Sequence, residues 1–195
     1  MKALLAAIKK TAARAVGAKA PARIAERRIL FVCMGNICRS PTAEGVLRKV
    51  LAERAPDLDV QVDSAGTHGY HTGEPPDPRA CRAAERRGID LKTLRARQVT
   101  PNDFEHFELV LAMDEHNRDF LLGACPVEYQ GRIKLFLDFA PHLARRDVPD
   151  PYYGGSTGFE QVLDLVEEAT AGLIEHLQRT APPRPRESAP GGSAD

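Results

Sequence analysis

Segment 31–41, FVCMGNICRSP, constrains the fold of this 195-residue chain more than any other stretch. It completes the run RILFVC (28–33), which is apolar after its first residue. An unbroken apolar run is typical of a strand buried on both faces of a parallel sheet. A helical pattern starts at Pro41, and its apolar positions are Ala43, Val46, Leu47, Val50 and Leu51. The sequence therefore predicts a buried strand that passes through a short loop into a helix.

Three further strand-like runs follow, at 58–66, 107–114 and 131–137. Strands that are separated by helices imply right-handed crossovers and a parallel sheet. We therefore expect an α/β fold, with a four-stranded parallel sheet that carries helices on both faces. In such folds ligands bind beyond the carboxyl ends of the strands, where the loop after the first strand lies.

Helical patterns occupy the stretches between and after these strands. The first, 77–88, has Asp77 as a cap and Gly88 as a stop, and another begins after Asp114. A long final helix is expected from Thr157, which has capping-box spacing to Glu160. Its expected buried positions are Phe159, Val162, Leu163, Val166, Leu173 and Leu177.

Charge and composition together divide the chain into an extension (1–28), a domain (29–180) and a tail (181–195). Residues 1–30 carry eight Lys and Arg but one acid, and removing them from the totals of 27 each leaves 19 basic and 26 acidic residues. The extension is alanine-rich, with helically spaced apolar residues at Leu4, Leu5, Ile8, Ala12, Ala15 and Val16. It could touch an anionic surface such as a membrane or an acidic partner, pack back on the domain, or be a frayed end. The Pro-, Gly- and Ser-rich tail is expected to be disordered.

The composition is that of a globular protein, with 43% hydrophobic and 28% charged residues. No apolar run reaches the roughly 18–20 residues of a membrane span. The four cysteines are too few for a disulfide scaffold, so we expect a reducing, cytoplasmic location. We expect no nucleic-acid partner.

The loop after the first strand has the composition of an anion site. Gly35 and Asn36 readily adopt left-handed angles, so that successive N–H groups turn inward as a phosphate-binding nest. Ser40 suits a helix cap and Pro41 the first turn, so the positive helix end would face the same nest. Arg39 adds a fork of donors that fits a phosphate edge. We predict a phosphate-binding loop.

Cys33 lies at the base of this loop. The surrounding N–H groups and Arg39 favour a thiolate over a thiol, and a thiolate aimed at a phosphoryl group is a nucleophile. Other interpretations remain open at this point. Cys33 could be an inert core thiol, Cys33 and Cys38 could be half of a zinc site, or the loop could bind phosphate without chemistry. No second ligand pair follows, so we expect no metal.

VCMGNICRSP resembles the signature of the low-molecular-weight protein tyrosine phosphatases, C-x5-R-[ST] near the amino end of the domain. DSAG, GEPPDPRA, ARQVTPNDF, LAMDEHN and DPYYG resemble further landmarks of that family in the same order, between Ile29 and about His176. The resemblance implies that Cys33 attacks phosphorus and forms a phosphocysteine. Ser40 would bond the thiolate, and Asn36, helped by Ser64, would hold the loop. The implied phosphate-binding residues are Met34, Gly35, Asn36, Ile37, Cys38, Arg39 and Ser40.

The motif DVPDPYYGG implies a second catalytic group. Asp150 matches the family's general acid and base, whereas Asp147 is expected to be a solvated loop charge. The resemblance places Tyr152 and Tyr153 along the substrate pocket, opposite Tyr70. Aromatic walls suit a phenyl ring, and a deep pocket favours phosphotyrosine over phosphoserine.

Three positions bear on neighbouring functions. Ile37 stands where relatives that remove phosphate from arginine carry threonine, and Leu94 stands where some eukaryotic relatives carry a histidine. Cys38 could be a buried filler, or it could trap oxidised Cys33 as a disulfide, as the equivalent cysteine can in this family.

The expected function is hydrolysis of phosphotyrosine in proteins by a monomer or weak dimer without a cofactor. The alternatives are an arsenate reductase or protein arginine phosphatase of the same fold, or a non-catalytic phosphotyrosine-binding module. Arsenate reductases of this kind need two further cysteines on a mobile segment. Only Cys81 and Cys125 remain here, and they are not so paired.

Overall fold

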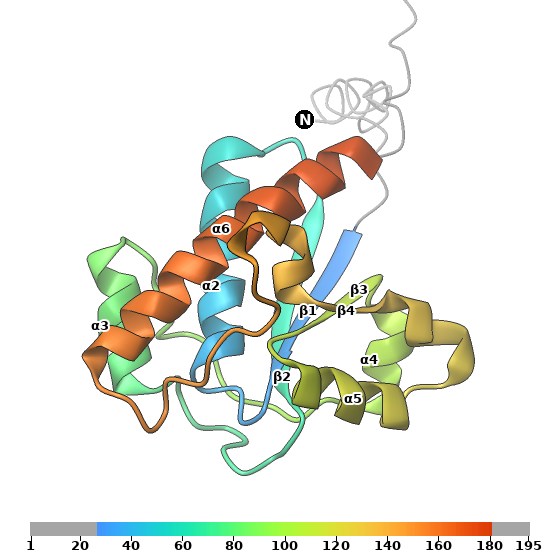
Figure 1. Cartoon of the computed structure of the whole chain (residues 1–195), viewed down its shortest axis with the longest axis horizontal. Coiled ribbons are helices and arrows are strands. Elements are labelled where there is room, and N and C mark those ends of the chain that lie inside the picture. Colours follow the sequence, from blue (N-terminus) through green and yellow to red (C-terminus); the bar gives the residue numbers. More distant parts are fainter. Residues whose placement is uncertain (1–26, 181–195) are drawn as a thin grey trace, which may run out of the picture.

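The computed structural model describes residues 27–180, and Figure 1 shows their arrangement. The strands are β1 (Arg27–Cys33), β2 (Val60–Gly66), β3 (Leu109–Ala112) and β4 (Ile133–Leu135). The α-helices are α2 (Arg39–Arg54), α3 (Pro78–Arg86), α4 (Pro101–His106), α5 (Glu115–Ala124) and α6 (Ser156–Thr180). Short 3-10 helices span Val127–Arg132, Phe136–Phe139 and Pro141–Leu143.

The four strands form one parallel sheet in the order β2-β1-β3-β4. The chain leaves β1 toward β2 on one side and then returns to place β3 on the other side of β1. The order therefore reverses at β1, and the carboxyl end of β1 is the point where open α/β sheets bind ligands. The predicted parallel sheet is confirmed, and residues 34–38 lie at this switch point.

Two apolar clusters cover the two faces of the sheet. Ile29, Phe31 and Cys33 of β1 belong to the cluster that includes α2, α3 and α6. Leu30 and Val32 belong to the other cluster, on the side of α4 and α5. Figure 1 shows these two groups of helices on opposite sides of the strands. Because successive strand residues point to opposite faces, the continuous apolar run predicted helices on both faces, as observed.

The final helix buries the expected side chains. Phe159, Val162, Leu163, Val166, Leu173 and Leu177 all lie in the core. The capping-box prediction at its start is wrong, because α6 begins at Ser156 and Thr157 already lies within the first turn. The Glu160 carboxylate instead pairs with Arg86 and Arg87, which joins α6 to the end of α3.

The predicted ends of two other helices are confirmed. Asp77 accepts a hydrogen bond from the Arg79 N–H (2.7 Å), and Gly88, with φ of 70°, follows the end of α3. Asp114 accepts one from the Asn117 N–H (2.7 Å) at the start of α5. The sequence did not predict α4 or the 3-10 helices. One of these begins at Phe136 and shortens the fourth strand from its predicted range, 131–137.

The predicted boundary at 28 between the basic extension and the domain is wrong by two residues, because Arg27 and Arg28 pair with β2 as part of β1. The rest of the predicted extension, residues 1–26, and the predicted tail, residues 181–195, lie outside the described residues. Within residues 27–180, no helix is both long enough and apolar enough to span a membrane.

Candidate active site

The loop between β1 and α2 closes around the Cys33 thiol. The Asn36 N–H donates to Cys33 Sγ (3.3 Å), and the backbone at Asn36 is left-handed, with φ of 57°. The prediction of left-handed angles is therefore confirmed for Asn36 and wrong for Gly35, whose φ is not positive. Gly35 instead makes a close approach, because a Cβ there would lie 3.0 Å from the His71 ring and that ring would have to shift. The loop is thus shaped by one left-handed residue and one close approach.

The start of α2 places Ser40 against Cys33. The helix begins at Arg39 with Cys38 at its cap position, so the predictions of a start at Pro41 and of Ser40 as the cap are wrong. Ser40 is fully buried, and its hydroxyl lies 3.0 Å from Cys33 Sγ. The Asn36 amide donates to the same hydroxyl (2.9 Å). A hydroxyl in this position can donate to a thiolate.

A buried polar network holds Asn36 in place. Its Nδ2 donates to Ser64 Oγ (2.9 Å), and its Oδ1 accepts from the Arg97 N–H (2.9 Å). Ser64 in turn donates to the carboxylate of Glu44 (2.6 Å). Burial raises the pKa of Glu44, and this effect is partly offset by the hydrogen bond from Ser64 and the charge of Arg48. The sequence predicted support from Ser64, but it did not predict Glu44, which is a polar residue on the buried side of α2.

Arg39 lies under the loop and is paired with two carboxylates. Its Nη1 donates to Asp114 (2.5 Å) and to the Val148 carbonyl (3.0 Å), and its Nη2 donates to Asp150 (2.7 Å). Burial opposes the charge on Arg39, but Cys33 and the two carboxylates outweigh it, so the pKa of Arg39 is raised. The sequence did not predict Asp114 as a site residue. The available signal was its position two residues after the end of β3, the strand beside β1.

Asp150 reaches the site from the loop before α6. Its side chain is 42% exposed, and its Oδ1 accepts a hydrogen bond from the Tyr152 N–H (3.0 Å). Arg79 of α3 donates to the Tyr152 carbonyl (3.1 Å), which ties this loop to the rest of the domain. Asp147 is exposed, as predicted, and accepts a hydrogen bond from the Glu115 N–H (3.1 Å).

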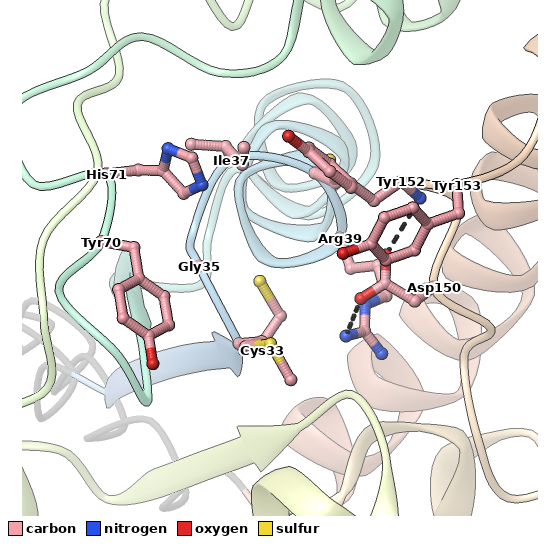
Figure 2. Close-up of a pocket in the computed structure, with 11 residues that line it drawn as sticks. Cys33, Gly35, Ile37, Arg39, Tyr70, His71, Asp150, Tyr152 and Tyr153 are labelled. Carbon is pink, nitrogen blue, oxygen red and sulfur yellow. Dashed lines mark hydrogen bonds and ion pairs between the residues drawn. The ribbon is translucent and has the colours of Figure 1, made fainter.

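A cavity of about 300 Å³ opens above Cys33. Figure 2 shows Tyr70 and His71 on one side of it, and Asp150, Tyr152 and Tyr153 on the other. The phosphate-binding loop also lines the cavity, with Met34, Ile37 and Cys38. The structure therefore brings together the predicted pocket residues, although Tyr153 is 97% exposed and stands at the mouth. His71, whose ring is 2.7 Å from Glu74, lines the pocket and was not predicted.

The four cysteines are free thiols and differ in surroundings. Burial raises the pKa of Cys38, and the charge of Asp77 adds to this effect. Cys81 packs against the core on the α2 and α6 side of the sheet, whereas Cys125 lies in the cluster on the other side. Among residues 27–180, no three His, Cys, Asp or Glu side chains are grouped so that they could hold a metal ion, so Cys33 and Cys38 are not part of such a group.

The parallel sheet and the thiol-bearing loop at its switch point define an α/β protein with a cysteine nucleophile in an anion-binding loop. The family model described as "Low molecular weight phosphotyrosine protein phosphatase" matches residues 28–182. The chain belongs to this family.

Individual relatives agree with this assignment. The low molecular weight phosphotyrosine protein phosphatase of Homo sapiens is 41% identical over 77% of this chain and 96% of its own length. The low molecular weight protein-tyrosine-phosphatase of Streptomyces coelicolor is 41% identical over 75% of this chain and 91% of its own. The crystal structure of a protein tyrosine phosphatase from Entamoeba histolytica superimposes with a TM-score of 0.76 at 40% identity, over 78% of this chain and 97% of that one.

Proposed function

We propose that this protein hydrolyses phosphotyrosine in proteins through a covalent phosphocysteine on Cys33. The observation that carries the proposal is the position of Cys33 Sγ at the base of the cavity. It lies 3.0 Å from the Ser40 hydroxyl and 3.3 Å from the backbone nitrogen of Asn36. In the first step the Cys33 thiolate attacks phosphorus, and the bond from phosphorus to the tyrosyl oxygen breaks. Asp150 gives its proton to that oxygen.

The second step returns the enzyme to its starting state. The Asp150 carboxylate takes a proton from water, the water oxygen attacks phosphorus, and the phosphorus–sulfur bond breaks. The Ser40 hydroxyl donates to the departing sulfur, while Arg39 and the loop amides hold the phosphoryl oxygens. Phosphate leaves, and the Cys33 thiolate and a protonated Asp150 are restored.

The cavity suits an aryl phosphate. Cys33 is 3% exposed, so a substrate must carry its phosphate to the bottom of the pocket. A phenyl ring carries its phosphate further from the peptide backbone than the side chain of phosphoserine does, so phosphotyrosine is better suited to a phosphate site at the base of a cavity lined by Tyr70 and Tyr152. Ile37 adds an apolar surface to the same wall.

The alternative chemistries fit the site less well. A disulfide relay of the arsenate reductase kind needs thiols that reach Cys33, and Cys81 and Cys125 lie on opposite sides of the sheet. A module that only binds phosphotyrosine has no use for a carboxylate in the position of Asp150. For removal of phosphate from arginine, Ile37 stands where relatives with that activity carry threonine, and a phosphoarginine peptide tests this alternative.

The experiment compares phosphotyrosine, phosphoserine and phosphoarginine peptides of one sequence, with wild type, Cys33→Ser and Asp147→Asn, in reductant and chelator. We expect selective cleavage of phosphotyrosine by wild type and by the control Asp147→Asn, and none by Cys33→Ser. Full activity of Cys33→Ser, or a preference for another phosphopeptide, would contradict the proposal.

The partner and location follow as separate proposals. A phosphoprotein is the substrate, and we propose that the enzyme acts in the cytoplasm as a monomer or weak dimer. The residues before β1 would bring it to an acidic partner or a membrane, because six of residues 1–26 are basic and one is acidic. Deleting residues 1–26, which leaves β1 intact, should weaken binding to anionic vesicles or to an acidic partner and leave turnover of a small aryl phosphate unchanged. Unchanged binding would refute the role of the extension.

A further inference from the structure

Most of the exposed large apolar side chains of the described domain gather around the cavity. They are Met34, Tyr70, Phe120, Val127, Tyr152 and Tyr153. Four of these line the cavity, and among the described residues only Phe120 and Val127 of this set do not. Phe120 is 42% exposed and belongs to α5, yet it is joined to the cavity wall through other rings.

His68 forms the link between Phe120 and the wall. The rings of His68 and Tyr70 are stacked, with centroids 5.1 Å apart and an interplanar angle of 12°. The rings of His68 and Phe120 lie 5.4 Å apart and are tilted by 40°. The backbone N–H of His68 donates to the Met34 carbonyl (3.0 Å), and this hydrogen bond ties the segment that carries His68 to the phosphate-binding loop. We call His68, Tyr70 and Phe120 the aromatic shelf.

We propose that the aromatic shelf binds an apolar or aromatic side chain of the substrate peptide that lies close to the phosphotyrosine. This inference rests on the proposed function. The shelf is continuous with the cavity through Tyr70, so a peptide that leaves the cavity on this side must cross it. Phe120 is two ring-to-ring steps of 5.1 and 5.4 Å from Tyr70 at the cavity wall. An extended chain advances about 3.3–3.6 Å per residue, so a side chain about three positions from the phosphotyrosine can reach Phe120.

The physical benefit comes from covering exposed rings. Tyr70 is 73% exposed, and Phe120 retains a large apolar area in water. Apolar surface that is exposed next to a binding cavity commonly marks a recognition site. A peptide side chain that packs on these rings should therefore strengthen binding, or raise kcat/KM, by about two- to tenfold.

The test uses phosphotyrosine peptides that differ at one position, with Phe or Ser placed in turn at about three positions on each side. The rates kcat/KM are measured for wild type, Phe120→Ser, Phe120→Tyr and Val127→Ser. Each rate is divided by the same variant's rate on p-nitrophenyl phosphate, so that changes in the chemical step cancel. Val127, which is 81% exposed and does not line the cavity, provides the matched control.

We expect wild type to prefer Phe over Ser at one position or more by about two- to tenfold. Phe120→Ser should abolish that preference, and both Phe120→Tyr and Val127→Ser should retain it. A wild type without any preference, or a preference that survives in Phe120→Ser, would overturn the shelf and leave the proposed function standing. Failure of wild type to cleave any of the phosphotyrosine peptides would overturn both.

Discussion

The carboxylate of Asp150 is ion-paired with Arg39, with 2.7 Å between Oδ2 and Nη2. The proposed mechanism gives these two groups separate tasks, proton transfer and phosphate binding. A phosphoryl group that binds Arg39 therefore competes with Asp150 for the same guanidinium. Asp114 and the Val148 carbonyl accept hydrogen bonds from Nη1, and these contacts hold the other side of Arg39 when a phosphoryl group binds.

Replacing Asp150 with Asn should separate binding from chemistry. Loss of the proton donor is expected to lower kcat by about 10² or more with phenyl phosphate. The loss should be smaller with p-nitrophenyl phosphate, because its leaving anion needs a proton less. Inhibition by inorganic phosphate should become severalfold tighter, since a negative charge beside Arg39 has been removed. Steady-state kinetics with the two substrates and with phosphate measure all three effects.

The matched control for this variant is Asp147→Asn, which alters the other aspartate of the same segment. Asp147 is exposed and does not line the cavity, so its kcat and its phosphate inhibition should match wild type. Equal losses on both substrates in Asp150→Asn would argue against a role in protonating the leaving group.

Asn36 combines a left-handed backbone with a polar network, and two substitutions separate these contributions. Asn36→Gly keeps the backbone conformation accessible and removes the side-chain hydrogen bonds, whereas Asn36→Ala also makes left-handed angles unfavourable by about 1–2 kcal/mol. Both variants should lose activity, and Asn36→Ala should be the less stable of the two to urea by about that amount. Equal unfolding free energies for Asn36→Gly and Asn36→Ala would show that the left-handed backbone at position 36 does not destabilise the alanine variant.

Gly172 allows α6 to approach the 3-10 helix Phe136–Phe139. A Cβ at this position would overlap the Phe139 carbonyl oxygen, a backbone atom that cannot move aside cheaply. We expect Gly172→Ala to lower the free energy of unfolding by about 1–3 kcal/mol in urea titrations. Gly123 of α5 has no atom within 4 Å of the same added group. Gly123→Ala should therefore be neutral or stabilising by up to about 1 kcal/mol, and a similar loss in both variants would contradict the packing argument.

Asp103 should give the protein part of its resistance to acid. Burial opposes the ionised form, but hydrogen bonds from Arg97 and Thr100 outweigh it, so the pKa of Asp103 is lowered from 3.8. The unfolded chain then binds this proton more tightly than the folded protein. Its contribution to stability is present above about pH 4 and is lost as the pH falls through the lowered value.

The variant Asp103→Asn lacks this titration. The difference between the unfolding free energies of wild type and Asp103→Asn should therefore be largest near pH 7 and should narrow as the pH falls toward 3. Urea unfolding across this range measures the difference. A constant difference would show that the ionisation of Asp103 does not contribute.

The sheet and the loop were predictable because both depend on local patterns. The apolar run ending at Cys33 predicted a strand buried on both faces, and the ends of two helices followed from Asp77, Gly88 and Asp114. The start of α2 was misjudged. Ser40 is a good capping residue in isolation, but its hydroxyl is directed to Cys33 and Asn36 instead.

Long-range partners were not predictable from spacing. The contact between Arg39 and Asp114 joins residues 75 positions apart, and the contact between Ser64 and Glu44 depends on how α2 packs against β2. The position of Phe120 beside His68 likewise depends on the placement of α5 against the loop after β2. A single sequence gives no local signal for such pairs.

The most direct test of the mechanism is detection of phosphate on Cys33. Wild type and Asp150→Asn are mixed with a phosphotyrosine peptide, quenched in acid during turnover and analysed by mass spectrometry of the proteolytic peptides, with Cys33→Ser as the control. The mechanism predicts a phosphoryl group on Cys33 in both active forms and none in the control. Turnover without a phosphorylated Cys33, or catalysis by Cys33→Ser at the wild-type rate, would contradict it.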